Sequence, residues 1–186
     1  MVSFQTRIHR ETLDYDGLAL SPHWIYRQFD LMGNALVAFV GEAKVSTDHM
    51  VDLEDVKKNA PIYSPKMLHF IGEWFQGTFE EALLMQMLFI QNVYSELAQC
   101  HAADLRRRGN DIYFKDRKVS VSIVTKSLTS FLMHTGVNVE TENTPIPAAG
   151  LKELNLDPFG FATRVISTFQ ADLTSCGKSR VKVLPR

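Results

Sequence analysis

The sequence has little cysteine, no excess of charge of either sign and no long apolar run. Its two cysteines, Cys100 and Cys176, are too few for a disulfide framework and form no C-x-x-C motif. Lys and Arg number 20 against 21 Asp and Glu, so the chain lacks the basic excess of a dedicated DNA-binding protein. No segment approaches about 18 apolar residues, and the N-terminus lacks the apolar core of a signal peptide. These absences predict a cytoplasmic protein with no membrane span.

What is present fits a compact chain with a substantial core. The 186 residues are 45% hydrophobic and 22% charged, which excludes a disordered chain. That length predicts a single domain over residues 1–186.

Local patterns predict a mixture of strands and helices. Short apolar runs bounded by turn residues predict strands over 6–13, 35–45, 111–114, 118–125 and 129–139. Capping residues and helical spacing predict helices over 22–32, 65–75, 79–108 and 158–175. Cys100 falls on the apolar stripe of the third helix and is expected to be a buried thiol.

Two neighbouring strands each have one apolar and one small, polar face. Because side chains alternate along a strand, Lys118, Ser120 and Ser122 share one face of the first strand. On the next strand, His134, Gly136 and Asn138 share a face. If the strands pair, all six lie together. Such a face is either a solvated side of an antiparallel sheet or a concave site whose small residues leave room around one cation.

The same region resembles the catalytic core of two enzyme families. Residues 109–123 read GNDIYFKDRKVSVSI and residues 134–139 read HTGVNV. Biotin protein ligases and lipoate protein ligases carry this order: Asn-Asp, a strand, a short turn with a lysine, a strand of small residues and Gly-x-Asn. The resemblance implies the α+β fold of class II aminoacyl-tRNA synthetases, a mainly antiparallel sheet flanked by helices.

The resemblance also implies roles for particular residues. Lys118 aligns with the lysine that contacts both the acyl carboxylate and the α-phosphate of the adenylate. Asn110 and Asp111 match the Asn-Asp pair and are expected to bind ligand. ATP or an adenylate is the implied cofactor.

Two parts of the ligase pattern are missing. Biotin ligases have a Gly- and Arg-rich loop after an early strand, whereas residues 44–49 contain neither residue type. We expect Lys44 and His49 to line the ligand site there instead. Octanoyltransferases of this fold use a cysteine where this chain has Phe159. ATP-dependent ligation and cysteine-based acyl transfer therefore each lack a key part.

Over the whole chain, the likeness is to a mainly archaeal family known as a domain of unknown function. It is carried by residues 49–56 (HMVDLEDV), 62–64 (IYS) and 67–70 (MLHF). The chain is identified as a member of that family, which brings a fold and no activity.

Other charged clusters leave alternatives open. Asp48, His49 and Asp52 are close in sequence, and His69 precedes Glu73 by one turn of the predicted 65–75 helix. They are either ligands for a divalent ion or pocket and surface residues, and we predict no metal site. The arginines 106–108 are either a phosphate-binding patch or cations that complement the C-terminus of a helix.

We therefore predict that a small carboxylate, acyl or adenylate-like ligand binds on the polar sheet face. Lys118 is its anion partner and His134 the candidate base, with His49 as an alternative, and the chemistry would be acyl transfer or adenylation. The rival hypothesis is a non-catalytic scaffold, such as a homodimer that contacts a carrier protein or tRNA.

Overall fold

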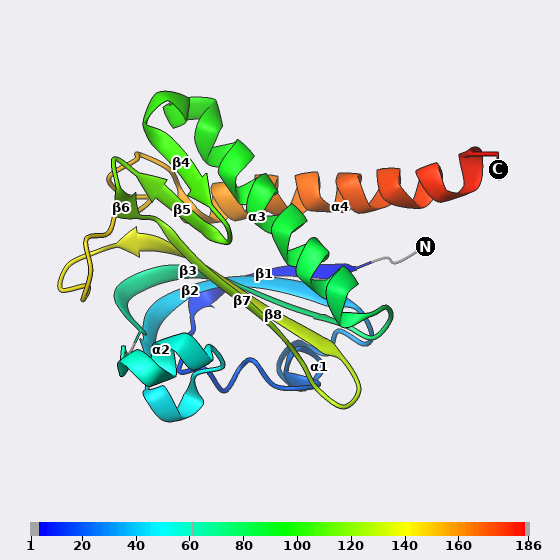
Figure 1. The fold of residues 1–186 in the computed structure, drawn as a ribbon, viewed down its shortest axis with the longest axis horizontal. Helices are drawn as coiled ribbons and strands as arrows, with labels where there is room; N and C mark the ends of the chain where they lie inside the picture. The colour runs from blue at the N-terminus through cyan, green and yellow to red at the C-terminus, as the bar shows by residue number, and fades with distance from the viewer. Residues whose placement is uncertain (1–3, 61, 185–186) are drawn as a thin grey trace.

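The computed structural model describes residues 4–60 and 62–184. Its large sheet has the strand order β1 (Gln5–Thr12), β2 (Ala35–Val45), β3 (Ile62–Trp74), β8 (Phe131–Glu140) and β7 (Ser120–Lys126) (Figure 1). Strands β1 and β2 are parallel, and the other pairs are antiparallel. A small antiparallel sheet joins β4 (Leu105–Arg108), β5 (Asp111–Phe114) and β6 (Arg117–Lys118). The predicted α+β architecture is confirmed.

Two long helices cover one face of the large sheet. Helices α3 (Phe79–His101) and α4 (Pro158–Lys182) lie side by side above it (Figure 1). Their apolar residues, such as Phe89 and Phe161, pack in one core with Leu68 and Phe70 of β3. Burial of this apolar area provides most of the driving force for folding.

The opposite face of the sheet is covered by smaller elements. Phe39 of β2 and Ile71 of β3 pack there against Tyr15 and against Ile25 of α1 (Trp24–Phe29). Helix α2 (Leu53–Lys58) buries none of its residues and lies at the end of this face (Figure 1). The sheet face between these coverings is where a ligand can reach the strands.

The predicted helix over residues 65–75 is wrong, because this segment is the central part of β3. Residues 67–74 are buried on both faces of the sheet, between β2 and β8. A strand covered on both faces is apolar throughout, so its sequence lacks the alternation that would distinguish it from a helix. The register skips Pro65, which lacks an N–H group.

The third helix begins as predicted and ends earlier. A capping box starts α3: Glu81 N–H donates to Thr78 Oγ1 (3.2 Å), and Thr78 N–H donates to Glu81 Oε2 (2.7 Å). The helix ends at His101, and residues 106–108 are in β4 instead of in its last turn. Leu105 is buried there and anchors the strand.

The three arginines of β4 all contact neighbouring groups. Arg106 lies 3.4 Å and Arg108 lies 3.8 Å from the carboxylate of Asp116, while Arg107 donates to Gln91 Oε1 at 2.8 Å. Arg106 and Arg108 share one carboxylate and stay exposed, and Arg107 bonds to an uncharged amide, so these contacts leave both alternatives open.

Three further expectations are corrected. Helix α1 covers only Trp24–Phe29, and both of its caps, His23 and Asp30, are left-handed. Helix α4 runs to Lys182, and its last turns extend beyond the sheet (Figure 1). Cys100 is exposed, because it lies on the side of α3 that faces solvent.

The alternation predicted for the strand over 118–125 is also wrong. The chain passes at Val119 from the small sheet to the large one, and this break shifts the pattern by one residue. Ser122 therefore pairs with Thr135 and bonds to Gln86 of α3, so it faces the helices. Val121 and Ile123 instead share the other face with Gly136 and His134.

Candidate functional site

A cavity of about 810 Å³ lies over the sheet face that α3 and α4 leave free. Its floor is formed by β7, β8 and Met67 of β3, and its sides by α2, the β5–β6 region and the loop 144–148. Among the residues of the two sheets and their turns that line it are Met67, Asn110, Asp111, Lys118, Val121, Ser122, Ile123, His134 and Asn138. This volume is within the range of pockets that bind small molecules.

Hydrogen bonds fix the backbone of Lys118 at the edge of the cavity. Its N–H donates to Pro147 O at 2.9 Å, and its carbonyl accepts from Ala149 N–H at 3.0 Å and from Asn138 Nδ2 at 3.1 Å. These bonds fix the end of β6 between β8 and the loop 144–148. The strand therefore presents the lysine side chain from a rigid support.

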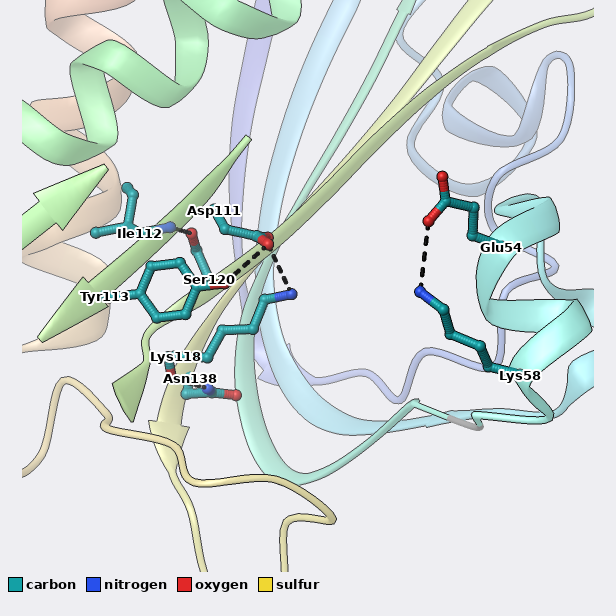
Figure 2. Close-up of polar contacts among 8 residues, drawn as sticks. All are labelled: Glu54, Lys58, Asp111, Ile112, Tyr113, Lys118, Ser120 and Asn138. Atoms are coloured by element: carbon teal, nitrogen blue, oxygen red, sulfur yellow. Dashed lines mark hydrogen bonds and ion pairs between the residues drawn. The ribbon is translucent and has the colours of Figure 1, made fainter. Parts of the chain in front are cut away.

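The ammonium group of Lys118 is paired and only partly satisfied. Nζ lies 3.0 Å from Asp111 Oδ2, which also accepts from the Tyr113 hydroxyl at 3.3 Å (Figure 2). Asp111 is the only partner of Nζ in the described part of the chain. Because an ammonium has three N–H donors, two remain for an anionic group in the cavity.

Helix α2 faces Lys118 from the other side of the cavity. Asp52 caps the helix, since its carboxylate accepts from Glu54 N–H at 2.8 Å. Glu54 pairs with Lys58 at 3.4 Å, and this exposed pair is seen opposite Lys118 in Figure 2. The charged side chains of α2 are thus open to solvent, whereas the Lys118 side chain is mostly covered.

Between its charged groups the cavity also has an apolar surface, which is similar in extent to the polar one. The side chains that provide this surface are Val45, Met50, Ile62, Met67, Val121, Ile123 and Ile146. An apolar trough that ends at a lysine suits a molecule with a hydrocarbon part and an anionic head.

Two buried histidines lie at the floor beside Tyr15, and of the two His134 borders the cavity. His69 of β3 and His134 of β8 are 0% and 4% exposed, and His69 Nδ1 lies 3.1 Å from His134 Nε2. The Tyr15 ring stacks on the His134 ring at 4.0 Å between centroids. His69 Nε2 contacts Gly41 O at 3.4 Å. The β3–β8 register places the two imidazoles on the same sheet face.

Burial keeps both imidazoles neutral at pH 7. Loss of solvation lowers the pKa of His69 to about 4. Burial, with the neighbouring His69 as a second cause, lowers the pKa of His134 well below its usual value. His134 is therefore a hydrogen-bonding group near neutral pH and a weak base.

We expect the burial of His69 to make the folded protein less stable as the pH is lowered below neutrality. The pKa of His69 is about 4 when folded and about 6.5 when unfolded, so the unfolded chain binds more protons between these values. Stability is thus complete above pH 6.5 and falls as the pH approaches 4. The expected loss from His69 alone is about 3 kcal/mol.

Urea unfolding at pH 7 and pH 4 measures this loss. The His69→Gln variant should lose about 3 kcal/mol less than the wild type over this interval. His49→Gln is the matched control, because His49 is exposed. Equal pH dependence in the wild type and His69→Gln would contradict the assignment.

The structure brings together most of the residues predicted for the site. Asn110, Asp111, Lys118, His134, Asn138 and His49 line the cavity. His49 is exposed at its rim, where Nδ1 lies 3.0 Å from Asp16 O.

Four predicted residues are placed differently. Ser120 is fully buried on the helix side, where its Oγ accepts from Ile112 N–H at 3.2 Å. Ser122 borders the cavity, but its hydroxyl contacts Gln86 and Thr135. Gly136 lies beneath Met67, and Lys44 is exposed outside the lining. The break in the strand at Val119 explains why Ser120 and Ser122 do not point into the cavity.

Sequence reasoning missed Tyr15, the apolar wall and the partnership of His69 with His134. The signal for His69 is a lone polar residue in the apolar run of residues 67–71. Tyr15 and α2 reach the site only through tertiary structure, so no local pattern could indicate them.

The described residues, 4–60 and 62–184, contain no group of three or more His, Cys, Asp or Glu side chains that could hold a metal ion. In β3, His69 and Glu73 share a face but are about 13 Å apart along the strand. None of the described helices is both long and apolar enough to cross a membrane.

The fold is that of the biotin and lipoate protein ligases. A biotin protein ligase from Aquifex aeolicus is 18% identical, with a TM-score of 0.59 over 92% of this chain and 70% of that one. A lipoate-protein ligase A bound with ATP is 13% identical, with a TM-score of 0.61 over 93% and 86% of the two chains. At these identities the likeness establishes the fold alone.

Within this fold, the chain belongs to the family described as Domain of unknown function (DUF366), whose model matches residues 4–184. A protein of unknown function from Pyrococcus horikoshi is similar, with 34% identity and a TM-score of 0.91 over 99% of this chain and all of that one. An uncharacterised protein of Methanocaldococcus jannaschii is 28% identical over 95% of this chain and 82% of its own length. The predicted family membership is confirmed.

Proposed function

We propose that this protein binds a small carboxylate, acyl or adenylate-like ligand in the cavity, with the anionic head at Lys118 and the hydrocarbon part in the apolar trough. The observation that carries the proposal is the half-buried ammonium of Lys118, 3.0 Å from Asp111, at the end of that trough. A fixed cation in a partly desolvated site binds an anion more strongly than a surface lysine does.

Solved structures of similar fold support the proposal that the ligand is an acyl-adenylate or resembles one. One of them is a lipoate-protein ligase bound with ATP, and another is a biotin ligase in complex with biotin and ATP. A cavity of about 810 Å³ has room for an acyl chain joined to a nucleotide.

If the protein is an enzyme, the reaction that it catalyses on this ligand would be adenylation or acyl transfer. In adenylation, a carboxylate oxygen attacks the α-phosphorus of ATP and pyrophosphate leaves. Lys118 would stabilise the charge on the oxygens of that phosphorus. Octanoate-dependent exchange of label between pyrophosphate and ATP measures this step.

A binding module without catalysis is the second candidate, and one observation favours it. Phe159, at the octanoyltransferase cysteine position, packs 5.4 Å from the Arg10 guanidinium. Neighbouring Asp157 caps α4, because Gly160 N–H donates to its carboxylate at 2.6 Å. These residues therefore have structural contacts where a catalytic nucleophile would be needed.

Thermal unfolding with a ligand panel tests the proposal. The panel contains ATP, biotin, lipoate, octanoate and 5′-O-(N-octanoylsulfamoyl)adenosine, a stable acyl-adenylate mimic, with sulfamoyl adenosine as the control that lacks the acyl chain. At a concentration of 100 Kd, a ligand stabilises by about 2.7 kcal/mol, which raises the Tm of a chain of this size by about 5–10 °C.

We expect the acyl mimic to give this shift and sulfamoyl adenosine to give less than half of it. No shift with any compound, together with co-purified RNA or a partner protein, would overturn the proposal in favour of a scaffold. Absence of pyrophosphate exchange, combined with tight binding of the mimic, would assign the protein as a binding module.

A further inference from the structure

The two buried histidines form a chain whose proton positions can be deduced. Gly41 O can only accept a hydrogen bond, so the His69 Nε2 atom beside it, at 3.4 Å, carries the proton. In the neutral ring His69 Nδ1 is then an acceptor. His134 Nε2, at 3.1 Å from it, must therefore be the donor.

This order leaves His134 Nδ1 as an unprotonated acceptor. Within residues 4–60 and 62–184, this atom has no hydrogen-bond partner, and Asn92 Nδ2 is the buried side-chain polar atom without one. His134 Nδ1 therefore retains contact with solvent. His134 is 4% exposed and borders the cavity, which is therefore the space from which a ligand can approach Nδ1.

The surroundings hold this acceptor in one orientation. The Tyr15 ring stacks on one side of the His134 imidazole, with 17° between the ring planes. The Phe39 ring stacks on His69 behind it, at 5.0 Å between centroids. Rotation of either imidazole would break the hydrogen bond between them, so the acceptor is preorganised.

We propose that His134 Nδ1 is a specificity site for a hydrogen-bond donor on the hydrocarbon part of the ligand, so that the preferred ligand carries an O–H or N–H group there. His69 is a positioning residue, since it fixes the tautomer of His134 without reaching the cavity. This inference rests on the proposed function, and it names the substrate class more narrowly: a hydroxyl- or amide-bearing acyl group, not a plain alkyl chain.

The physical reason is the cost of leaving a buried acceptor unpaired. A plain alkyl chain over His134 would remove the solvent from Nδ1 and offer no bond in return. A donor at the right position restores the bond. One such bond with a buried partner is expected to change affinity by about ten- to a hundredfold.

Acylsulfamoyl adenosines with matched chains test this preference. The probes are the N-octanoyl compound and its derivatives with a hydroxyl on C4, C6 or C8, and calorimetry gives each Kd. In the wild type, at least one hydroxylated probe should bind about tenfold or more tightly than the octanoyl probe. That preference should disappear in His134→Phe, which keeps a ring beneath Tyr15, and persist in Lys44→Ala, because Lys44 is exposed outside the cavity lining.

A second measurement needs no variant. Long-range ¹H–¹⁵N spectra of the imidazole rings should show His69 and His134 both protonated at Nε2. The Nδ1 resonance of His134 should shift when the preferred probe binds. This readout distinguishes a hydrogen-bonding role from a structural one, because a ring that merely packs would not shift.

The outcomes separate the two proposals. If no probe binds, the proposed function fails and this inference fails with it. If all four probes bind wild type within twofold of one another, the proposed function stands and the donor preference is overturned. A His134 ring protonated at Nδ1 would also overturn it.

Discussion

Replacing Lys118 by Ala is expected to weaken binding of 5′-O-(N-octanoylsulfamoyl)adenosine about a hundredfold, because a charge-assisted bond is lost from a partly buried site. The remaining carboxylate of Asp111, now unpaired, would also repel the anionic head. Titration calorimetry measures the affinity, and the effect should fall on the Kd and not on the number of sites.

The same substitution should hardly change stability. The Lys118 and Asp111 side chains are 22% and 30% exposed, so water still reaches Asp111 in the variant, and the Tyr113 hydroxyl still donates to its carboxylate. We expect the Tm of Lys118→Ala to lie within about 2 °C of the wild type. This separates loss of ligand from loss of fold.

Lys44→Ala is the matched control. Both lysines were predicted for the site, but Lys44 is exposed outside the cavity. Its removal should change the Kd less than about twofold. Equal losses in both variants, or an unchanged Kd in Lys118→Ala, would contradict the role assigned to Lys118.

The second large effect is expected at Gly41, where the segment that follows β1 runs beside β2 and comes very close to its backbone. A Cβ at this position would lie 2.5 Å from the Leu13 carbonyl carbon and closer still to its oxygen. Leu13 N–H donates to Val40 O at 3.1 Å, and Tyr15 N–H donates to Glu42 O at 2.8 Å. The backbone of this segment therefore cannot move away without breaking bonds on both sides of Gly41.

We expect Gly41→Ala to lower the free energy of unfolding by about 3 kcal/mol, at the upper end of overpacking effects. Tyr15, carried by the same segment, would also move from its place over His134. Urea unfolding measures the loss, and tyrosine resonances report the displacement.

Gly72→Ala in the neighbouring β3 is the control for this prediction. The nearest atom to its added Cβ is Met133 Cε at 3.4 Å, the flexible end of a side chain. This variant should lose less than about 1 kcal/mol. If Gly41→Ala were as stable as Gly72→Ala, this would contradict the close contact between Gly41 and the Leu13 carbonyl group.

The parts of the fold that sequence predicted are those with a clear local pattern. The apolar residues 35–45 and the alternation of residues 131–139 identify β2 and β8 with almost correct bounds. The capping residues Thr78 and Glu81 locate the start of α3. In each case the local signal agrees with the tertiary environment.

The errors arise where tertiary contacts override the local signal. Residues 67–74 are buried on both sides because β3 is central in the sheet, so apolar residues occur on both faces and periodicity could not separate strand from helix. Residues 106–108 are cationic like a helix C-terminus, yet pairing with β5 makes them a strand.

For the site, sequence identified Lys118 and His134 and misjudged their neighbours. His134 and Asn138 lie on the predicted face, because β8 alternates without interruption. The break at Val119 shifts the alternation by one residue. Val121 and Ile123 therefore lie on that face in place of Ser120 and Ser122. The predicted polar patch is therefore a cation beside apolar side chains, which suits the acyl and adenylate-like members of the predicted ligand class.

Mapping of amide resonances tests the central claim most directly, because it locates the bound ligand in the unmodified protein. ¹H–¹⁵N spectra are recorded as the octanoyl mimic is added. The proposal predicts changes concentrated at residues 118–123, 134–138 and 50–60, with helix α4 unaffected. Saturable changes confined to the face covered by α3 and α4, or no changes at millimolar concentration, would contradict ligand binding between Lys118 and α2.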